Sequence, residues 1–465
     1  MDRPHLGAGL HAAAYRSPPV HLVRQPVNAP LRRAFRLRSG RGPAWEVASA
    51  LAVWLALLVA ARLLIERLYE RGINVHVGNA PLVGALDPRV SWRLVPAVAL
   101  GALAVAFAPR LAQRLPWRAL LGAAAAGSIG WALALAVSDG LEAIVAPLLY
   151  PSDYLNDVQR AGDPLFLLSS FLERADQFAT HPKAHPPGLL ALLSLLREAG
   201  LGGEWTFAGL ILGGAALAPA AVMIAARELA GEAAARAAAP FLVVSPAALW
   251  IATSADALFM GVAAAGIALM ALATGRTGRP GDAIAAAGGV VLGLALHLSY
   301  GVAPLGLLVV AVAVARRRVR PLLVGALGLA VVTAAFVLAG FWWLDGLERT
   351  RELYAGGISR SRPYGTFLLV SLAAFAVAIG PATAAGIARL RDHGLWLLAG
   401  STAAAVLVAD LSGLSKGETE RIWLPFAPWV IVACAALAGG RAGRAWLGVQ
   451  VAAALTLQAA VTSPW

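Results

Sequence analysis

Long uninterrupted apolar runs dominate this chain. After residue 44, runs rich in Ala, Leu, Val and Gly recur almost to the end of the 465-residue sequence. Each holds roughly 17 to 25 residues, which is enough for a helix to cross a hydrocarbon layer about 30 Å thick. The runs lack the period-2 alternation of a transmembrane β-strand. The sequence therefore predicts an all-α, polytopic bundle of transmembrane helices.

Reading each run against its polar flanks gives about thirteen spans. We expect them to form a single transmembrane domain over residues 45–465. The predicted spans cover residues 45–68, 92–108, 118–137, 206–226, 237–252, 257–274, 283–298, 302–315, 321–343, 366–385, 395–409, 422–438 and 445–461.

Charge predicts the orientation of these spans. The chain is 59% hydrophobic and carries a net charge of +13. If the N-terminus is cytosolic, the connections on that side collect most of the Arg residues, whereas acidic residues outnumber basic ones on the other side. This is the positive-inside pattern. We therefore expect a multi-pass plasma-membrane protein with an extracytoplasmic C-terminus.

Residues 1–44 form an Arg-rich stretch with several Pro and no apolar core segment. We interpret it as a disordered cytosolic tail and not as a cleavable signal peptide. Its simplest role is to set the orientation, and it could also touch anionic lipid headgroups. Arg-rich arms also bind nucleic acids, but we expect no nucleic-acid partner here.

The largest predicted extracytoplasmic loop covers residues 138–205. Its HPPG motif places Pro186 and Pro187 where a first helical turn tolerates proline. The apolar stretch that follows, to about Leu201, is too short to cross a bilayer. We therefore expect an interfacial helix that begins at this motif.

An acidic motif, SDYLNDV, stands early in this loop and contains Asp153 and Asp157. In a helix, their spacing of four residues would put both carboxylates on one face, where like charges repel. Such a pair suits a general base or a bound cation, although a solvated loop would also tolerate it. Farther on, His181, Lys183 and His185 alternate, so an extended segment would present all three to one side. They make a weak zinc set, and a capping or interfacial His185 is equally compatible with the pattern.

Asp256 lies where one predicted span ends and the next begins. An ionisable group at membrane depth costs on the order of 2.5 to 3.5 kcal/mol, so it usually faces a polar cavity or marks a function. A helix N-cap is the alternative interpretation.

Two later outer loops carry clustered charges. Arginine side chains beside a membrane suit phosphate or pyrophosphate, since guanidinium offers paired donors. Ion pairs on solvated helices are the alternative in the first loop, whereas at Arg421 we favour phosphate because that residue is expected to border the lipid. The candidate residues are Arg360 and Arg362 in residues 345–364, and Lys416, Glu418, Glu420 and Arg421 in residues 410–421.

Together these motifs resemble the C-type membrane glycosyltransferases, which use polyprenyl-phosphate sugars, and among them the actinobacterial mannosyl- and arabinosyltransferases. The resemblance rests on the acidic motif at Asp153, on His185 to Gly188 about thirty residues later, and on Ala226 to Leu229 and Ser245 to Asp256. It is closest over residues 150–256. This chain departs from the pattern because three spans precede the acidic motif, and because two Asp residues four positions apart replace adjacent acidic residues.

The resemblance implies transfer of a sugar, with inversion, from a polyprenyl-phosphate donor to an extracytoplasmic hydroxyl of an envelope glycan, lipid or protein. Asp153 would be the catalytic base, ahead of Asp157, which would tune it or help to hold a divalent cation. The donor phosphate would bind at Lys416, Arg421, Arg360 and Arg362. His185, Lys183, Asp256, Glu418 and Glu420 would contact substrate. No cofactor besides the lipid-linked sugar is certain.

Two other classes of protein stay open. In a transporter or lipid flippase for an envelope precursor, the same outer charges would line a binding vestibule. Transporters commonly contain repeated halves and helices broken at mid-membrane, and we find no convincing repeat in the sequence. A non-catalytic assembly protein would have no polar cavity converging on Asp153.

Overall fold

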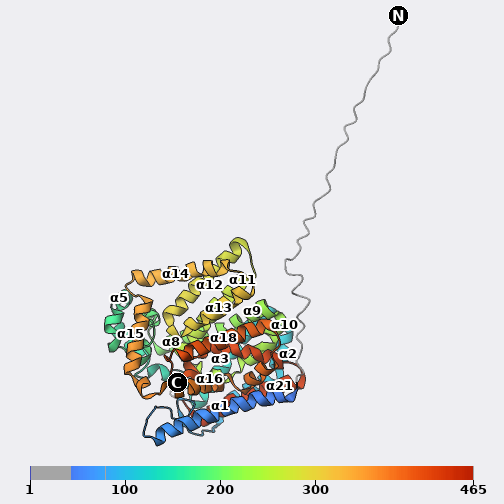
Figure 1. Cartoon of the computed structure of the whole chain (residues 1–465), viewed down its shortest axis with the longest axis horizontal. Coiled ribbons are helices and arrows are strands. Elements are labelled where there is room, and N and C mark those ends of the chain that lie inside the picture. Colours follow the sequence, from blue (N-terminus) through green and yellow to red (C-terminus); the bar gives the residue numbers. More distant parts are fainter. Residues whose placement is uncertain (2–42, 79, 464–465) are drawn as a thin grey trace. The chain divides into compact units, whose positions relative to one another are not determined.

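The computed structural model describes Met1 and residues 43–463 apart from residue 79. Most of the predicted basic tail therefore lies outside the described residues. From residue 43 onward the chain is almost entirely helical (Figure 1). One short antiparallel pair of strands, β1 (Ala85–Leu86) and β2 (Val461–Thr462), joins an early connection to the C-terminal segment. The all-α prediction is confirmed.

Within the described part of the chain, nine helical segments are long and apolar enough to cross a membrane, which identifies a multi-span membrane protein. Two of them contain breaks: α8 continues into α9, and the last consists of α19, α20 and 3₁₀ turns. They are α1 (Ala44–Glu70), α2 (Val95–Arg114, preceded by a 3₁₀ turn), α3 (Trp117–Ala136), α8 (Glu204–Ala215) with α9 (Leu217–Ala230), α11 (Ala255–Thr274), α12 (Gly278–Leu298), α14 (Arg320–Leu338), α18 (His393–Leu411), and the segment Thr419–Leu437 containing α19 (Thr419–Ile422) and α20 (Ala427–Ile431).

A tenth span would be a bent one. Helices α16 (Tyr364–Ile379) and α17 (Pro381–Arg389) meet at Gly380 at an angle of 90°. The side chain of Gln450 bridges this break, donating from Nε2 to the Ile379 carbonyl (2.7 Å) and accepting at Oε1 from the Ala382 amide (3.2 Å). The bend therefore leaves fewer backbone groups without a hydrogen bond than an open break would.

Three of the thirteen expected spans are absent from this set. The run 237–252 ends as a helix at Val243, because α10 (Glu232–Val243) is followed by Ser245-Pro246. The run 302–315 gives the short α13 (Gly306–Ala315). The run 445–461 lies in α21 (Gly440–Ala460), whose two Arg and two Gln residues lower its hydropathy. The estimate of about thirteen was therefore too high.

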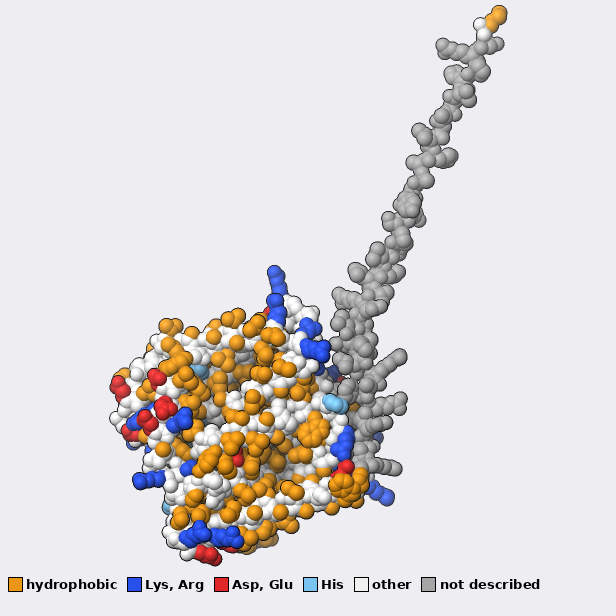
Figure 2. Space-filling model, in the orientation of Figure 1, with side chains coloured by type: hydrophobic (Ala, Val, Ile, Leu, Met, Phe, Trp, Pro, Cys, Tyr) orange, Lys and Arg blue, Asp and Glu red, His pale blue; other side chains and the backbone are white. Residues whose placement is uncertain are grey.

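The segment between α3 and α8, expected as a large loop, consists mainly of short helices and 3₁₀ turns. It includes α4 (Val158–Ala161), α5 (Pro164–Arg174), α6 (Thr180–Lys183) and α7 (Gly188–Glu198). Helix α7 begins directly after Pro187, as the HPPG motif predicts. Helix α15 (Trp343–Gly356) contacts α5 and lies beside it in Figure 1. Apolar side chains cover most of the face in Figure 2, and many of the charged ones lie toward its left and right edges.

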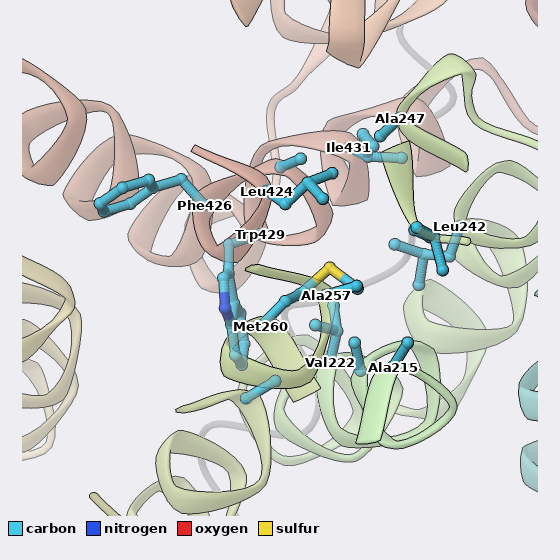
Figure 3. Close-up of a cluster of buried hydrophobic side chains, with 14 of the residues drawn as sticks. Ala215, Val222, Leu242, Ala247, Ala257, Met260, Leu424, Phe426, Trp429 and Ile431 are labelled. Atoms are coloured by element: carbon cyan, nitrogen blue, oxygen red, sulfur yellow. The ribbon is translucent and has the colours of Figure 1, made fainter. Parts of the chain in front are cut away.

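The core that supports the site is built on α11, which is buried along most of its length. Its Met260 packs near Trp429 of α20 and Val222 of α9, within a cluster of small and branched side chains (Figure 3). A Cβ atom on Gly261 would come within 1.7 Å of the Gly214 carbonyl oxygen, so only glycine permits this close crossing of α8 and α11. The start of α11, which carries Asp256, is thereby fixed in place.

Candidate functional site

Asp153 caps a 3₁₀ turn over Tyr154–Asp157, and its Oδ1 accepts the Tyr154 amide (2.7 Å). Its other oxygen, Oδ2, lies 3.1 Å from Nδ1 of His181. Asp153 is only 6% exposed. Asp157, at the end of the turn, instead binds the Arg160 guanidinium and the Ala179 amide. Asp153 is extended and precedes a 3₁₀ turn, so the two residues do not stand in one α-helix, and their carboxylates have separate partners.

The histidine segment is helical and not extended, because Thr180–Lys183 forms α6. The expected presentation of His181, Lys183 and His185 to one side therefore does not occur. The His181 amide donates to the Ser152 carbonyl (3.0 Å), which holds this segment against the acidic motif. His185 Nδ1 lies 2.9 Å from the His181 carbonyl oxygen. Among the described residues, the Lys183 ammonium has no recorded ion pair or hydrogen bond.

Burial shifts the pKa values of two neighbouring side chains, His185 and Tyr154. His185 lies close to the rings of Tyr154 and Phe259. Loss of water around His185 lowers its pKa, so the neutral imidazole is favoured. Burial raises the pKa of Tyr154 well above its ordinary value, and the negative charge of Asp153 adds to this effect. The Tyr154 hydroxyl has no hydrogen-bond partner within the described part of the chain.

Asp256 is the second residue of α11 and is 2% exposed. Ser254, and not Asp256, caps this helix, since the Ser254 Oγ accepts the Asp256 amide (3.3 Å). The N-cap interpretation of Asp256 is therefore wrong. Ser254 Oγ also donates to Asp256 Oδ2 (3.1 Å). The carboxylate lies in the first turn, near the positive end of the helix dipole.

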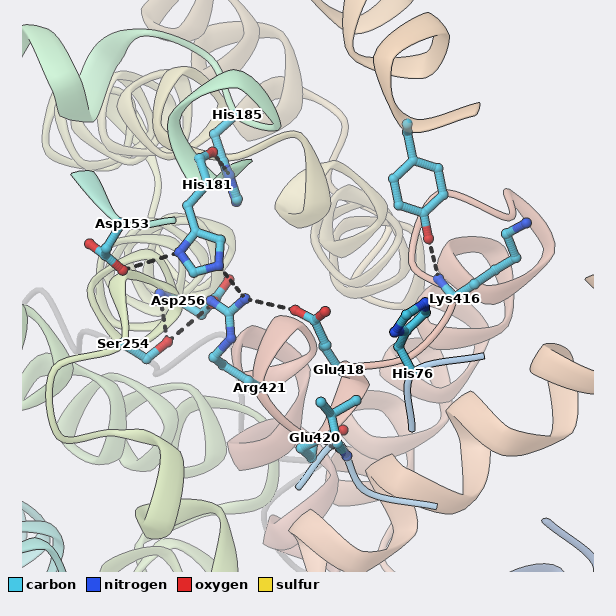
Figure 4. A network of polar contacts seen from close by, with 12 residues as sticks. His76, Asp153, His181, His185, Ser254, Asp256, Lys416, Glu418, Glu420 and Arg421 are labelled. Atoms are coloured by element: carbon cyan, nitrogen blue, oxygen red, sulfur yellow. Dashed lines mark hydrogen bonds and ion pairs between the residues drawn. The ribbon is translucent and has the colours of Figure 1, made fainter. Parts of the chain in front are cut away.

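Arg421, in the short helix α19, connects these segments. Its Nη1 donates to Asp256 Oδ2 at 2.5 Å, and its Nη2 lies 3.3 Å from both Glu418 Oε2 and His181 Nε2 (Figure 4). Arg421 is 5% exposed, so it is buried inside the bundle and does not border the lipid as the sequence led us to expect. Arg421 is thus ion-paired with both Asp256 and Glu418.

The hydrogen-bonding capacity of its neighbours indicates which ring nitrogen of His181 carries the proton. Arginine has only donors, so His181 Nε2 accepts from Arg421 and the ring is neutral there. Nδ1 then carries the proton and donates to Asp153 Oδ2. Asp153, His181, Arg421 and Asp256, which we call the polar network, thus form a continuous chain of hydrogen bonds across residues far apart in sequence.

Lys416 and Arg362 form a neighbouring cluster, in which both side chains donate hydrogen bonds to backbone carbonyl groups. Lys416 Nζ donates to the Ser359 (2.6 Å) and Arg362 (3.0 Å) carbonyls, and its amide donates to the Tyr354 hydroxyl (2.6 Å). Arg362 donates to the Val75 and Lys416 carbonyls, and one of its nitrogens lies 3.9 Å from Glu418. Burial, aided by the positive charge of Arg362, lowers the pKa of Lys416. A donor-binding role for either residue stays a prediction.

The remaining predicted residues are dispersed. Glu420 Oε1 accepts the Val83 amide (2.9 Å), and the side chain is 1% exposed, whereas Arg360 is exposed. In the same connection as Arg360, between α14 and α16, Arg349 pairs with Asp176 (2.6 Å) and Glu352 (2.9 Å). For Arg349 the ion-pair alternative raised from the sequence is confirmed.

Sequence reasoning did not place His181, Tyr154 or Ser254 in the site. The repeated His-Pro pairs of THPKAHPPG were visible, but they drew attention to His185 because of its place before α7. Among the described residues, no group of three or more His, Cys, Asp or Glu side chains is placed to hold a metal ion. A cavity between α2, α10 and α21 and a groove between α2 and α21 are lined by residues that do not include Asp153.

No family model matches the sequence, and the searches of curated proteins and of solved structures gave no significant match.

Proposed function

We propose that this protein is a membrane glycosyltransferase that moves a sugar from a polyprenyl-phosphate donor to an acceptor hydroxyl, with inversion. One observation supports this most: Asp153 and Asp256, which belong to two of the segments that resemble C-type glycosyltransferases, are joined through His181 and the buried Arg421. A scaffold gains nothing from a buried chain of four ionisable side chains, since replacing buried ion pairs by apolar residues is often neutral or stabilising.

In this proposal Asp153 is the base. Its Oδ2 is held by His181, and the acceptor hydroxyl would approach this carboxylate and lose its proton as the sugar C1 is attacked. A positioned base contributes roughly 10² to 10⁴ in rate. Tyr154, kept protonated by burial, could donate its unused hydroxyl proton to a substrate oxygen. Asp157 then serves to hold Arg160 and the Ala179 amide in place.

Arg421 would stabilise the phosphate that leaves. Of its two carboxylate contacts, Glu418 is the longer at 3.3 Å and the more exposed, with 22% of its side chain accessible. A phosphate oxygen would replace Glu418, while Asp256, at 2.5 Å, continues to hold the guanidinium. Charge-assisted contacts of this kind stabilise the negative charge that develops in the transition state.

The proposed site faces the extracytoplasmic side, as the charge pattern of the sequence predicts. A transporter or flippase is the second candidate, favoured by the broken span at Gly380. Gln450, which bridges that break, bonds to Ile379 and Ala382, and neither of these belongs to the polar network.

The test is sugar transfer by purified full-length protein in lipid vesicles. The donors are polyprenyl-phosphate mannose and arabinose, and the acceptor is a membrane extract from cells lacking this chain. Asp153→Asn keeps the side-chain size but removes its basicity, so turnover should fall at least about a hundredfold. Glu173→Gln, an exposed change in the same segment, is the matched control and should leave turnover unchanged.

A second readout separates the candidate functions. If Asp153→Asn transfers sugar normally and Asp157→Asn does not, the base is Asp157. If neither the native chain nor any variant transfers sugar, and labelled lipid instead crosses the vesicle bilayer, the flippase is the correct function.

A further inference from the structure

A cavity of about 320 Å³ opens between α2, α10 and α21, which pack against one another. The three helices lie together at one side of Figure 1. Arg110 and Arg114 stand near the C-terminal end of α2. The cavity lining contains no residue of the polar network, so the cavity is separate from the proposed catalytic site. Its lining comprises Ala106, Pro109, Arg110, Gln113, Arg114, Arg236, Ala237, Pro240, Phe241, Ala438, Gly439, Gly440, Gly443, Arg444 and Leu447.

The lining is positively charged, since it holds four Arg residues and neither Asp nor Glu. Arg236 is used structurally, because it pairs with Glu232 (2.7 Å) and donates to two α2–α3 carbonyls. Arg110, Arg114 and Arg444 make no recorded ion pair or hydrogen bond with any described residue. Three uncompensated guanidinium groups around one cavity repel each other, and a bound anion would relieve that repulsion.

An apolar groove continues from the cavity. It runs between α2 and α21, encloses about 720 Å³ and shares Ala106 and Arg444 with the cavity. The rest of its lining is apolar apart from Arg441, and comprises Val98, Ala102, Val105, Ala445, Gly448, Val451, Ala452 and Leu455. Because α2 is a membrane span, this groove extends along the hydrocarbon layer. A ligand that fits both parts has a negative head and an apolar tail.

We propose that this basic cavity and its groove bind one anionic phospholipid. The lipid phosphate lies among Arg110, Arg114 and Arg444, and an acyl chain lies in the groove beside Gly448. A free phosphate ion would leave the groove without a role. The Arg-rich N-terminal stretch and a second copy of this basic surface both carry the wrong charge. The proposal is independent of the sugar-transfer function.

The test measures binding of fluorescent phosphatidylglycerol to the purified full chain in neutral detergent micelles. Each basic residue near an anionic lipid strengthens binding roughly fivefold. The triple variant Arg110→Gln/Arg114→Gln/Arg444→Gln should therefore bind about a hundredfold more weakly. Unlabelled phosphatidylglycerol should compete, whereas phosphatidylcholine and inorganic phosphate should not. Its matched control, Arg118→Gln/Arg279→Gln/Arg318→Gln, removes three exposed arginines from outside the cavity and should bind normally.

A second variant tests the groove. A Cβ atom on Gly448 meets nothing within 4 Å, so a larger side chain starts in open space, and Gly448→Trp should lower lipid binding about tenfold by filling the groove. Gly122→Trp, equally open and exposed on α3, should not. Equal losses in the control triple variant, or competition by inorganic phosphate with no effect of Gly448→Trp, would overturn the proposal. If the triple variant does not fold, Gly448→Trp decides alone.

Discussion

Replacing Arg421 by methionine should destabilise the protein far more than replacing Arg421 and Asp256 together. Both side chains are at most 6% exposed, and their closest nitrogen and oxygen atoms are 2.5 Å apart. Removing one partner of a buried pair costs about 3–5 kcal/mol, since the other charge stays behind unpaired. The Coulomb energy agrees, because charges about 4 Å apart attract by about 4 kcal/mol at an effective dielectric constant near 20.

The double variant Arg421→Met/Asp256→Leu removes both charges and should melt above the Arg421→Met single variant. The assay is thermal unfolding in one fixed detergent, followed by tryptophan fluorescence. The exposed pair of Arg349 and Asp176, also 2.6 Å apart, is the matched control, and its coupling should be at most about 1 kcal/mol. A double variant that melts at or below both single variants would refute the claim that these two charges compensate each other.

Four further predictions follow. A cysteine placed at exposed Gln177 should react with an impermeant reagent from outside intact cells, and one at exposed Thr277 should not, whereas the reverse would invert the predicted topology. Folding lowers the pKa of His185, so below about pH 6.5 this residue binds a proton more readily in the unfolded chain than in the folded one. Stability should therefore fall with acidification, and His185→Gln should melt with a weaker pH dependence. Tyr154→Phe should leave the melting temperature unchanged or higher while slowing sugar transfer, since it removes a buried hydroxyl without a described partner; unchanged transfer would exclude substrate contact. Gly188→Ala should lower the melting temperature, because its Cβ would lie 2.2 Å from a backbone carbonyl oxygen of α12, and a neutral result would contradict that close contact.

The sequence predicted the parts of the fold that depend on local pattern. Apolar length located most spans, and Pro186-Pro187 correctly predicted where α7 begins. The sequence led to too many predicted spans, because the length of an apolar run takes no account of helix breaks such as Ser245-Pro246. It also takes no account of charged residues such as Arg441 and Arg444 in α21. Local breaks and scattered charges decide whether an apolar run is one span or a short helix.

The arrangement of the site was less predictable. Asp153, Asp256 and Arg421 were chosen from the sequence, but their connection through His181 was not. The contact between His181 and Arg421 joins residues 240 positions apart, so no local sequence pattern indicates it. The burial of Arg421 was missed for the same reason, since polar flanks in a sequence look alike whether they face lipid, water or another helix.

The bend at Gly380 has a mechanical consequence. Breaks of this kind act as hinges in many membrane proteins, because the freed backbone groups can exchange partners as the two halves swing. Here Gln450 holds the Ile379 carbonyl and the Ala382 amide at once, which ties α16, α17 and α21 to each other at the vertex. Opening this angle would break both contacts in a buried setting. The two hydrogen bonds therefore resist a change of the angle between α16 and α17, each by about 1 kcal/mol.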